Sequence, residues 1–193
     1  MRLLLLSRHG QSLFNVAGVV NGDPTLDPGL SDAGREAAQS LGVQLAAVPI
    51  DLCVTSRFPR AQETARLALG ARAGRVPHVV DPDLDDIRIG DLEGQTLDAY
   101  RAWKRGHGRS DPFPGGESLD EAARRYGAAF ARIAERPEET ILCVCHEIPV
   151  RYAVNASGGS ADPDHPIHDI ANATPYLFDD ESLRRGADAL RGA

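Results

Sequence analysis

Near its amino terminus the chain reads Leu3-Leu4-Leu5-Leu6-Ser7-Arg8-His9-Gly10, a continuous apolar run that stops abruptly at polar and charged residues. An apolar run of this length is typical of a β-strand that is buried on both faces. It is too short to be a signal-peptide core or a membrane-spanning helix. We therefore expect a buried strand whose carboxyl end presents Arg8 and His9.

Apolar runs and helical stripes alternate along the rest of the chain. Further strands are expected at residues 50–55, 76–80, 140–145 and 175–178. Helices are expected at residues 31–48, 61–69, 95–104, 118–133 and 148–156, with a last one at the carboxyl terminus. Alternation of this kind predicts an α/β fold, a three-layer sandwich with a mostly parallel sheet and helices on both faces. We expect a single domain over residues 1–193, with residues 95–125 as a helical insertion near the site.

Composition narrows the classes of function. The chain has 21 basic and 28 acidic residues, a formal net charge of -7, which argues against a nucleic-acid partner. A local site can still bind an anionic substrate, because its own charge can oppose the global one. Three cysteines, with no second close pair, predict neither a disulfide framework nor a metal site. We expect a cytoplasmic protein with no cofactor, no metal and no membrane partner.

Residues that can carry chemistry follow the predicted strands. In an open α/β sheet, ligands bind beyond the carboxyl ends of the strands. The residues at or shortly after these ends are Arg8, His9, Arg60, Asp85, Asp86 and His146. The irregular stretch from Gln11 to Leu30 is long for a structureless connection, which favours a role in a site. We therefore expect these side chains to converge at one rim of the sheet.

This set of groups suits one kind of reaction. Arginine guanidinium groups match phosphate oxygens, and a neutral imidazole can act as a nucleophile. A carboxyl group with a raised pKa can protonate a leaving alkoxide. Phosphoryl transfer depends mainly on positioning and on charge stabilisation of the transferred group. The residues therefore indicate phosphoryl transfer through a histidine.

From Leu3 to about Phe178 the chain resembles the histidine phosphatase superfamily, also called the phosphoglycerate mutase-like superfamily. The resemblance begins with Ser7-Arg8-His9-Gly10-Gln11-Ser12 followed by Asn15. It continues through five later segments, at residues 30–34, 55–65, 84–94, 114–118 and 145–151. The loop Pro114-Gly115-Gly116-Glu117-Ser118 is similar to one common in the phosphatase branch.

The resemblance implies a phosphoglycerate mutase-like fold and a role for each matching residue. His9 would be the nucleophile that becomes phosphohistidine. Arg8, Arg60 and His146 would form the phosphate pocket, and Asn15 would add a contact to substrate or phosphate. No metal is required, because the arginines and His146 supply the positive charge.

The chain departs from the family pattern at the expected proton donor. The aligned residue is Asp86, where this branch usually has glutamate, so the carboxyl group must come from a backbone that lies closer to the site. Glu147 is a second candidate, because an acidic residue beside the second histidine donates the proton in the acid-phosphatase branch. Asp86 is favoured by the alignment, and Asp85 and Glu93 are weaker candidates.

The leading functional prediction is a metal-independent phosphomonoesterase that acts on a small phosphorylated metabolite through a phosphohistidine. The first alternative is phosphoglycerate mutase-type phosphoryl transfer, which is less favoured because that branch usually has a longer chain with extra lid segments. The second alternative is a catalytically weak phosphate-binding module, motivated by aspartate at position 86.

Overall fold

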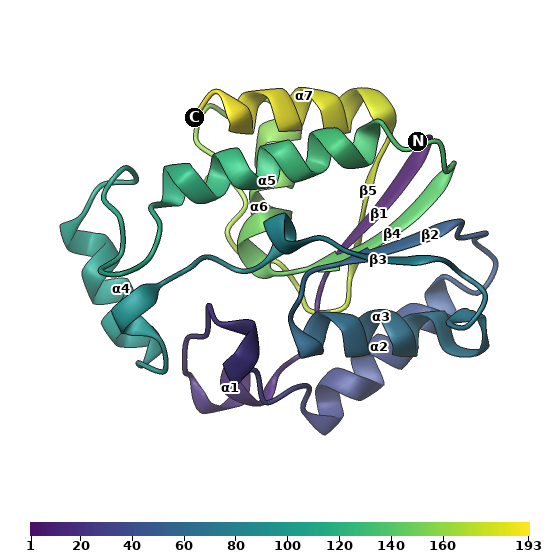
Figure 1. Ribbon diagram of the computed structural model, residues 1–193, viewed down its shortest axis with the longest axis horizontal. Helices are drawn as coiled ribbons and strands as arrows, with labels where there is room; N and C mark the ends of the chain where they lie inside the picture. The colour runs from purple at the N-terminus through teal and green to yellow at the C-terminus, as the bar shows by residue number, and fades with distance from the viewer.

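The structure is a computed structural model that describes all residues from 1 to 193. Its centre is one five-stranded sheet with the order β3-β2-β4-β1-β5 (Figure 1). The strands are β1 (Leu3–Arg8), β2 (Leu52–Thr55), β3 (His78–Val80), β4 (Thr140–Cys145) and β5 (Pro175–Phe178). Neighbouring strands from β3 to β1 run parallel, and only β5 is antiparallel, at the edge beside β1.

Helices cover both faces of this sheet (Figure 1). Its α-helices are α1 (Leu13–Ala17), α2 (Asp32–Gln44), α3 (Pro59–Leu69), α4 (Leu97–Gly106), α5 (Leu119–Ala134), α6 (Glu147–Ser157) and α7 (Asp180–Arg191). Short 3₁₀ turns occupy Pro24–Leu26, Gly70–Arg72, Pro82–Leu84 and Gly90–Leu92. Helices α5, α6 and α7 lie over one face, and α2 and α3 lie over the other. The predicted α/β fold with helices on both faces of a mostly parallel sheet is confirmed.

The central strands owe their burial to apolar side chains on both faces. All six residues of β4 are buried. Successive side chains of a strand point to opposite faces, so Cys143 and Cys145 enter the core beneath α5–α7 while Leu142 and Val144 enter the core above α2 and α3. The cysteines are free and buried, and they pack as small apolar residues of the core.

Local structure differs from expectation mainly between Gln11 and Leu30. The stretch was predicted to be irregular, but it contains the five-residue helix α1. A capping box explains this helix, because Ser12 accepts from the backbone N–H of Asn15 while the Asn15 side chain accepts from the backbone N–H of Ser12. The same device, formed by Ser118 and Glu121, begins α5.

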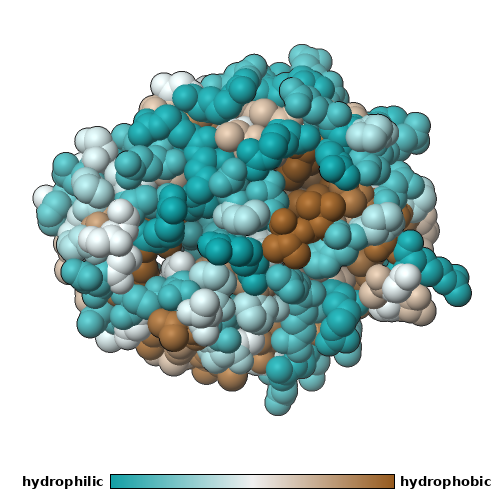
Figure 2. Space-filling view, viewed as in Figure 1, coloured by the Kyte–Doolittle hydropathy of each residue, from teal (hydrophilic) through white to brown (hydrophobic).

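Most of the face drawn in Figure 2 is hydrophilic, with an apolar area near its middle. Edge strand β3 is exposed along its whole length, and Val79 and Val80 leave about two fifths of their surface accessible.

None of the helices is both long and apolar enough to cross a lipid bilayer.

The turn after β1 depends on Gly10 and Gly34, where two backbone segments approach so closely that neither position has room for a side chain. A Cβ at Gly34, in the first turn of α2, would lie 2.0 Å from the carbonyl oxygen of Gln11. We expect Gly34→Ala to lower the free energy of unfolding by about 1–3 kcal/mol, since overpacking forces the backbone apart. Urea denaturation measures this. Gly74→Ala, where a Cβ meets nothing within 4 Å, is the control, and an equally stable Gly34→Ala would contradict the close-approach argument.

Candidate active site

His9 lies directly after β1 and is almost completely buried. Its Nδ1 is 2.6 Å from the carbonyl oxygen of Gly10, and its Nε2 accepts a hydrogen bond from Nε of Arg60 at 3.1 Å. The carbonyl can only accept, so Nδ1 carries the proton and Nε2 is unprotonated. Burial, reinforced by the charges of Arg60 and Arg8, holds the pKa of His9 well below its ordinary value. The imidazole is therefore neutral, with a free lone pair on Nε2.

Arg60 is the central cation of the site. It stands in the first turn of α3, just after β2, and is 3% exposed. Its terminal NH2 lies 3.2 Å from Oδ2 of Asp86 and 3.2 Å from Nδ1 of His146. Its NH1 donates to Oδ1 of Asn21 and lies 3.5 Å from Oδ1 of Asp27. One guanidinium thus joins both histidines and the aspartate that were predicted from separate parts of the chain.

His146 follows β4 and is completely buried, at the amino end of α6. Its Nδ1 accepts from Arg60, so Nε2 carries the proton and donates to the hydroxyl of Ser56 at 2.9 Å. Burial, together with the charge of Arg60, holds the pKa of His146 well below its ordinary value. The rings of His9 and His146 meet edge to face, with centroids 5.3 Å apart.

Arg8 and Glu147 form a second charged group at the same rim. Oε2 of Glu147 lies 2.9 Å from NH1 of Arg8, and Oε1 lies 3.3 Å from NH1 of Arg151. The carboxylate therefore bridges two arginines. NH1 of Arg8 also donates to the carbonyl oxygen of Ile170, whereas its buried Nε–H has no partner. A buried N–H without an acceptor is rare in folded proteins.

Asp86 enters the site from the segment after β3. Burial raises the pKa of its carboxyl group, against the opposing effect of Arg60 and with a further upward contribution from Glu147. The guanidinium of Arg125 holds this segment by donating to the carbonyl oxygens of Asp83 and Asp85 at 2.9 Å and of Asp86 at 3.4 Å. The backbone is therefore clamped at the position from which the shorter aspartate side chain reaches Arg60.

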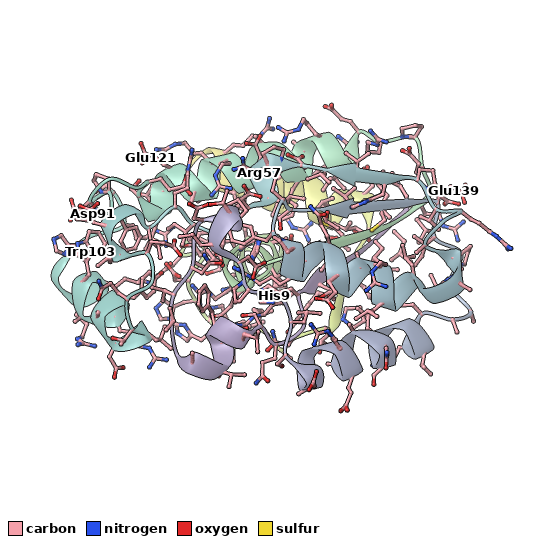
Figure 3. The ribbon with its side chains drawn as sticks, turned by 60° about the horizontal axis from the view of Figure 1, so that its bottom comes forward. His9, Arg57, Asp91, Trp103, Glu121 and Glu139 are labelled. Atoms are coloured by element: carbon pink, nitrogen blue, oxygen red, sulfur yellow. The ribbon has the colours of Figure 1, made fainter.

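These residues surround one cavity of about 670 Å³. The predicted site residues that line it are Arg8, His9, Asn15, Arg60, Asp86 and Glu147. His146 lies behind them, in contact with Arg60 and Asp86. In Figure 3 His9 lies near the middle of the molecule, and Trp103, on α4, lies toward the left end of the view. The cavity occupies the carboxyl ends of the strands, as the topology rule predicts.

Two carboxylates that were weaker candidates have other partners. Asp85 accepts from the backbone N–H of Arg57 at 2.8 Å and from its guanidinium at 2.6 Å. Glu93 accepts from the side chain of Asn21 and from the backbone N–H of Gly22, both at 2.7 Å. Both carboxylates thus hold loops in place, and neither lines the cavity.

The sequence analysis missed three residues that hold the central groups. Asn21 accepts from Arg60, and Asp27 accepts from the backbone N–H of Arg60 at 2.8 Å. Asn172 donates to the carbonyl oxygen of His9 at 2.7 Å. Asn21 and Asp27 belong to the stretch from Gln11 to Leu30, whose length was the only signal. No signal in the sequence marks Asn172.

Comparison with known proteins gives consistent results. A family model described as the histidine phosphatase superfamily (branch 1) matches residues 4–181. The 2,3-bisphosphoglycerate-dependent phosphoglycerate mutase of Methylobacterium sp. (strain 4-46) is 33% identical over 193 residues, covering 92% of this chain and 90% of that protein. Alpha-ribazole phosphatase from Shigella flexneri has a TM-score of 0.74 at 29% identity and covers 92% of this chain and 95% of its own. Mycobacterial glucosyl-3-phosphoglycerate phosphatase has a TM-score of 0.67 at 30% identity, and the match covers 81% of this chain and 82% of its own.

The hydrogen bonds predict opposite tautomers for the two buried histidines. At pH 6.5, where an ordinary imidazole is about half protonated, we expect both rings to be neutral. His9 should carry its proton on Nδ1, and His146 on Nε2. Long-range ¹H–¹⁵N correlation spectra distinguish these forms, with the exposed His107 as an internal reference. A doubly protonated His9 at this pH would contradict the proposed electrostatics.

Proposed function

The chain belongs to branch 1 of the histidine phosphatase superfamily, and from that premise we propose that it is a metal-independent phosphatase that hydrolyses a small phosphorylated metabolite. The observation that carries this proposal is His9, whose unprotonated Nε2 faces the cavity beside the guanidinium of Arg60. Solved relatives with this fold include an alpha-ribazole phosphatase and a glucosyl-3-phosphoglycerate phosphatase. The joint presence of nucleophile, cations and carboxyl group disfavours a module that only binds phosphate.

Binding of a phosphoryl group changes the partners of Arg60. Its N–H groups, which point to the two histidines in the unbound site, turn to the phosphoryl oxygens. The buried Nε–H of Arg8 gains the acceptor that it lacks. These charge-assisted bonds stabilise the negative charge of the transferred group, and they release Nε2 of His9 for attack.

The reaction then proceeds in two displacements. In the first, Nε2 of His9 forms a bond to phosphorus while the bond from phosphorus to the alcohol oxygen breaks, and that oxygen takes the proton of Asp86. In the second, water attacks phosphorus and gives a proton to the Asp86 carboxylate. The bond between phosphorus and nitrogen breaks, and phosphate leaves. His9 and Asp86 return to their starting protonation states.

Asp86 suits the role of proton donor better than Glu147. Its pKa is raised by burial, so a larger fraction of the carboxyl group is protonated near neutral pH than for an ordinary aspartate. It also contacts Arg60 directly. Glu147 instead bridges Arg8 and Arg151, so both of its oxygens are already engaged by cations. We assign Glu147 the task of orienting Arg8.

Phosphoglycerate mutase activity is the second candidate, because the cited sequence relative from Methylobacterium carries that name. The length argument against it does not separate this chain from that relative, since the alignment covers 90% of it. Assays with 3-phosphoglycerate, with and without 2,3-bisphosphoglycerate, distinguish the candidates. Release of 2-phosphoglycerate faster than inorganic phosphate would replace phosphatase by mutase as the main activity.

Loss of the nucleophile tests the proposal directly. We expect the wild-type protein to hydrolyse 4-nitrophenyl phosphate at the same rate with and without a chelator. His9→Ala should reduce kcat to background, because the covalent intermediate cannot form. Release of 4-nitrophenolate gives the rates, and circular dichroism verifies folding. Activity that survives in His9→Ala, or disappears with chelator, would refute the mechanism.

The two acidic residues should differ in their response to the leaving group. Asp86→Asn should lower kcat by about 10²–10³-fold for an alkyl phosphate, whose alkoxide needs a proton, and much less for 4-nitrophenyl phosphate. It should also remove the decline in activity that occurs as rising pH deprotonates Asp86. Glu147→Gln should raise KM for both substrates similarly, by loosening Arg8. The reverse pattern would make Glu147 the donor.

A further inference from the structure

The outer wall of the cavity carries a second group of cations, separate from Arg8 and Arg60. Helix α4 contributes Leu97, Tyr100, Arg101, Lys104 and Arg105 to the lining. These positions recur at intervals of three and four residues and therefore share one side of the helix. Lys104 is the only lysine in the chain. In all, six arginine or lysine side chains and three carboxylates line the cavity, in a protein whose net charge is -7.

Aromatic packing between α4 and the buried core fixes this orientation. Trp103 packs against the buried Phe113 with ring centroids 4.2 Å apart, and Tyr100 stacks on the same ring at 5.5 Å. At the start of the helix, the backbone N–H of Leu97 donates to the carbonyl oxygen of Gly18 at 2.8 Å. The helix is thus attached both to the core and to Gly18, the residue that ends α1, the helix that carries Asn15. These attachments hold the helix with its cationic side toward the cavity.

These outer cations lack strong partners within the protein. Lys104 and Arg105 form no ion pair within 4.0 Å, and Arg101 has only an exposed contact of 3.7 Å with Asp98. Two of the three cavity carboxylates are engaged deeper in the site, Asp86 by Arg60 and Glu147 by Arg8 and Arg151. Asp169 is the remaining carboxylate in the lining. The outer wall therefore has unneutralised positive charge.

The wall of the cavity is also partly apolar, with Phe14, Val20 and Ile148 among its lining residues. The cavity volume of about 670 Å³ lies within the range of sites for drug-sized ligands, and an inorganic phosphate ion fills only a small part of it. A substrate that fills the space therefore extends from His9 toward α4. Its middle would contact apolar groups, and its far end would meet the cations.

We propose that the cationic side of α4 is a specificity subsite, and that the preferred substrate is a phosphomonoester with an apolar middle and a second anionic group at its far end. This inference rests on the proposed phosphatase function and specifies its substrate class. The inner arginines hold the phosphoryl group, while Lys104 and Arg105 hold the distal carboxylate or phosphate. Charge-assisted hydrogen bonds of this kind contribute enough to change affinity by about tenfold each.

The test uses two phenyl phosphates that differ only in distal charge. One carries a para-carboxyethyl chain, and the other carries its methyl ester, so both have nearly the same leaving group. We expect the wild-type protein to prefer the carboxylate by about tenfold in kcat/KM. The double variant Lys104→Ala/Arg105→Ala should lose that preference, and Lys104→Glu/Arg105→Glu should prefer the methyl ester. Arg66→Ala removes an exposed arginine of α3 that does not line the cavity and should retain the wild-type ratio.

The outcomes separate the subsite from the activity. Hydrolysis of both esters at similar rates, or a carboxylate preference that persists in both double variants, would overturn the subsite while leaving the phosphatase intact. Failure of the wild-type protein to hydrolyse either ester or 4-nitrophenyl phosphate would overturn the phosphatase function and the subsite with it. Circular dichroism of each variant excludes unfolding as the cause of a lost preference.

Discussion

A buried guanidinium with no bulk water around it must find its partners within the protein, and Arg60 finds them in five residues from several segments of the chain. Its partners are the two histidines, the carboxylates of Asp27 and Asp86 and the side chain of Asn21. An uncompensated buried charge costs several kcal/mol, so these segments are held around one point. The same charge lowers the pKa of both imidazoles. Arg60 therefore shapes the site before any substrate binds.

The backbone around Asp86 is held in place by arginine side chains, and this positions the short carboxyl side chain at the site. Arg125 donates to the carbonyl groups of Asp83, Asp85 and Asp86, and it is itself paired with the buried Glu117. On the other flank, the Asp85 carboxylate is held by Arg57. Because the backbone is held on both sides, the short side chain of Asp86 stays within 3.2 Å of Arg60. Glu117 belongs to the Pro-Gly-Gly-Glu-Ser loop, so this loop acts on the site from a distance, through Arg125.

Much of this arrangement could be predicted from particular residues. The Leu3–Leu6 run and the 140–145 segment gave buried strands because apolar side chains must leave water on both faces of the sheet. The rule that ligands bind beyond strand ends then grouped Arg8, His9, Arg60, Asp86 and His146 correctly around one cavity. The helix within the Gln11–Leu30 stretch was missed because five residues give too short a period, although Ser12 and Asn15 form its cap.

The sequence by itself determined which residue types follow which strands, and its motifs were enough to identify the family. These depend on local patterns and on a topology that obeys general rules. Only the tertiary structure decided the tautomers of His9 and His146, the separate partners of Asp86 and Glu147, and the direction of the cationic side of α4. Each of these depends on contacts between residues far apart in the chain, such as Arg60 with His146 and Trp103 with Phe113. Burial and neighbouring charges set the protonation state of a side chain according to distances in space. The spacing of residues along the sequence does not give those distances.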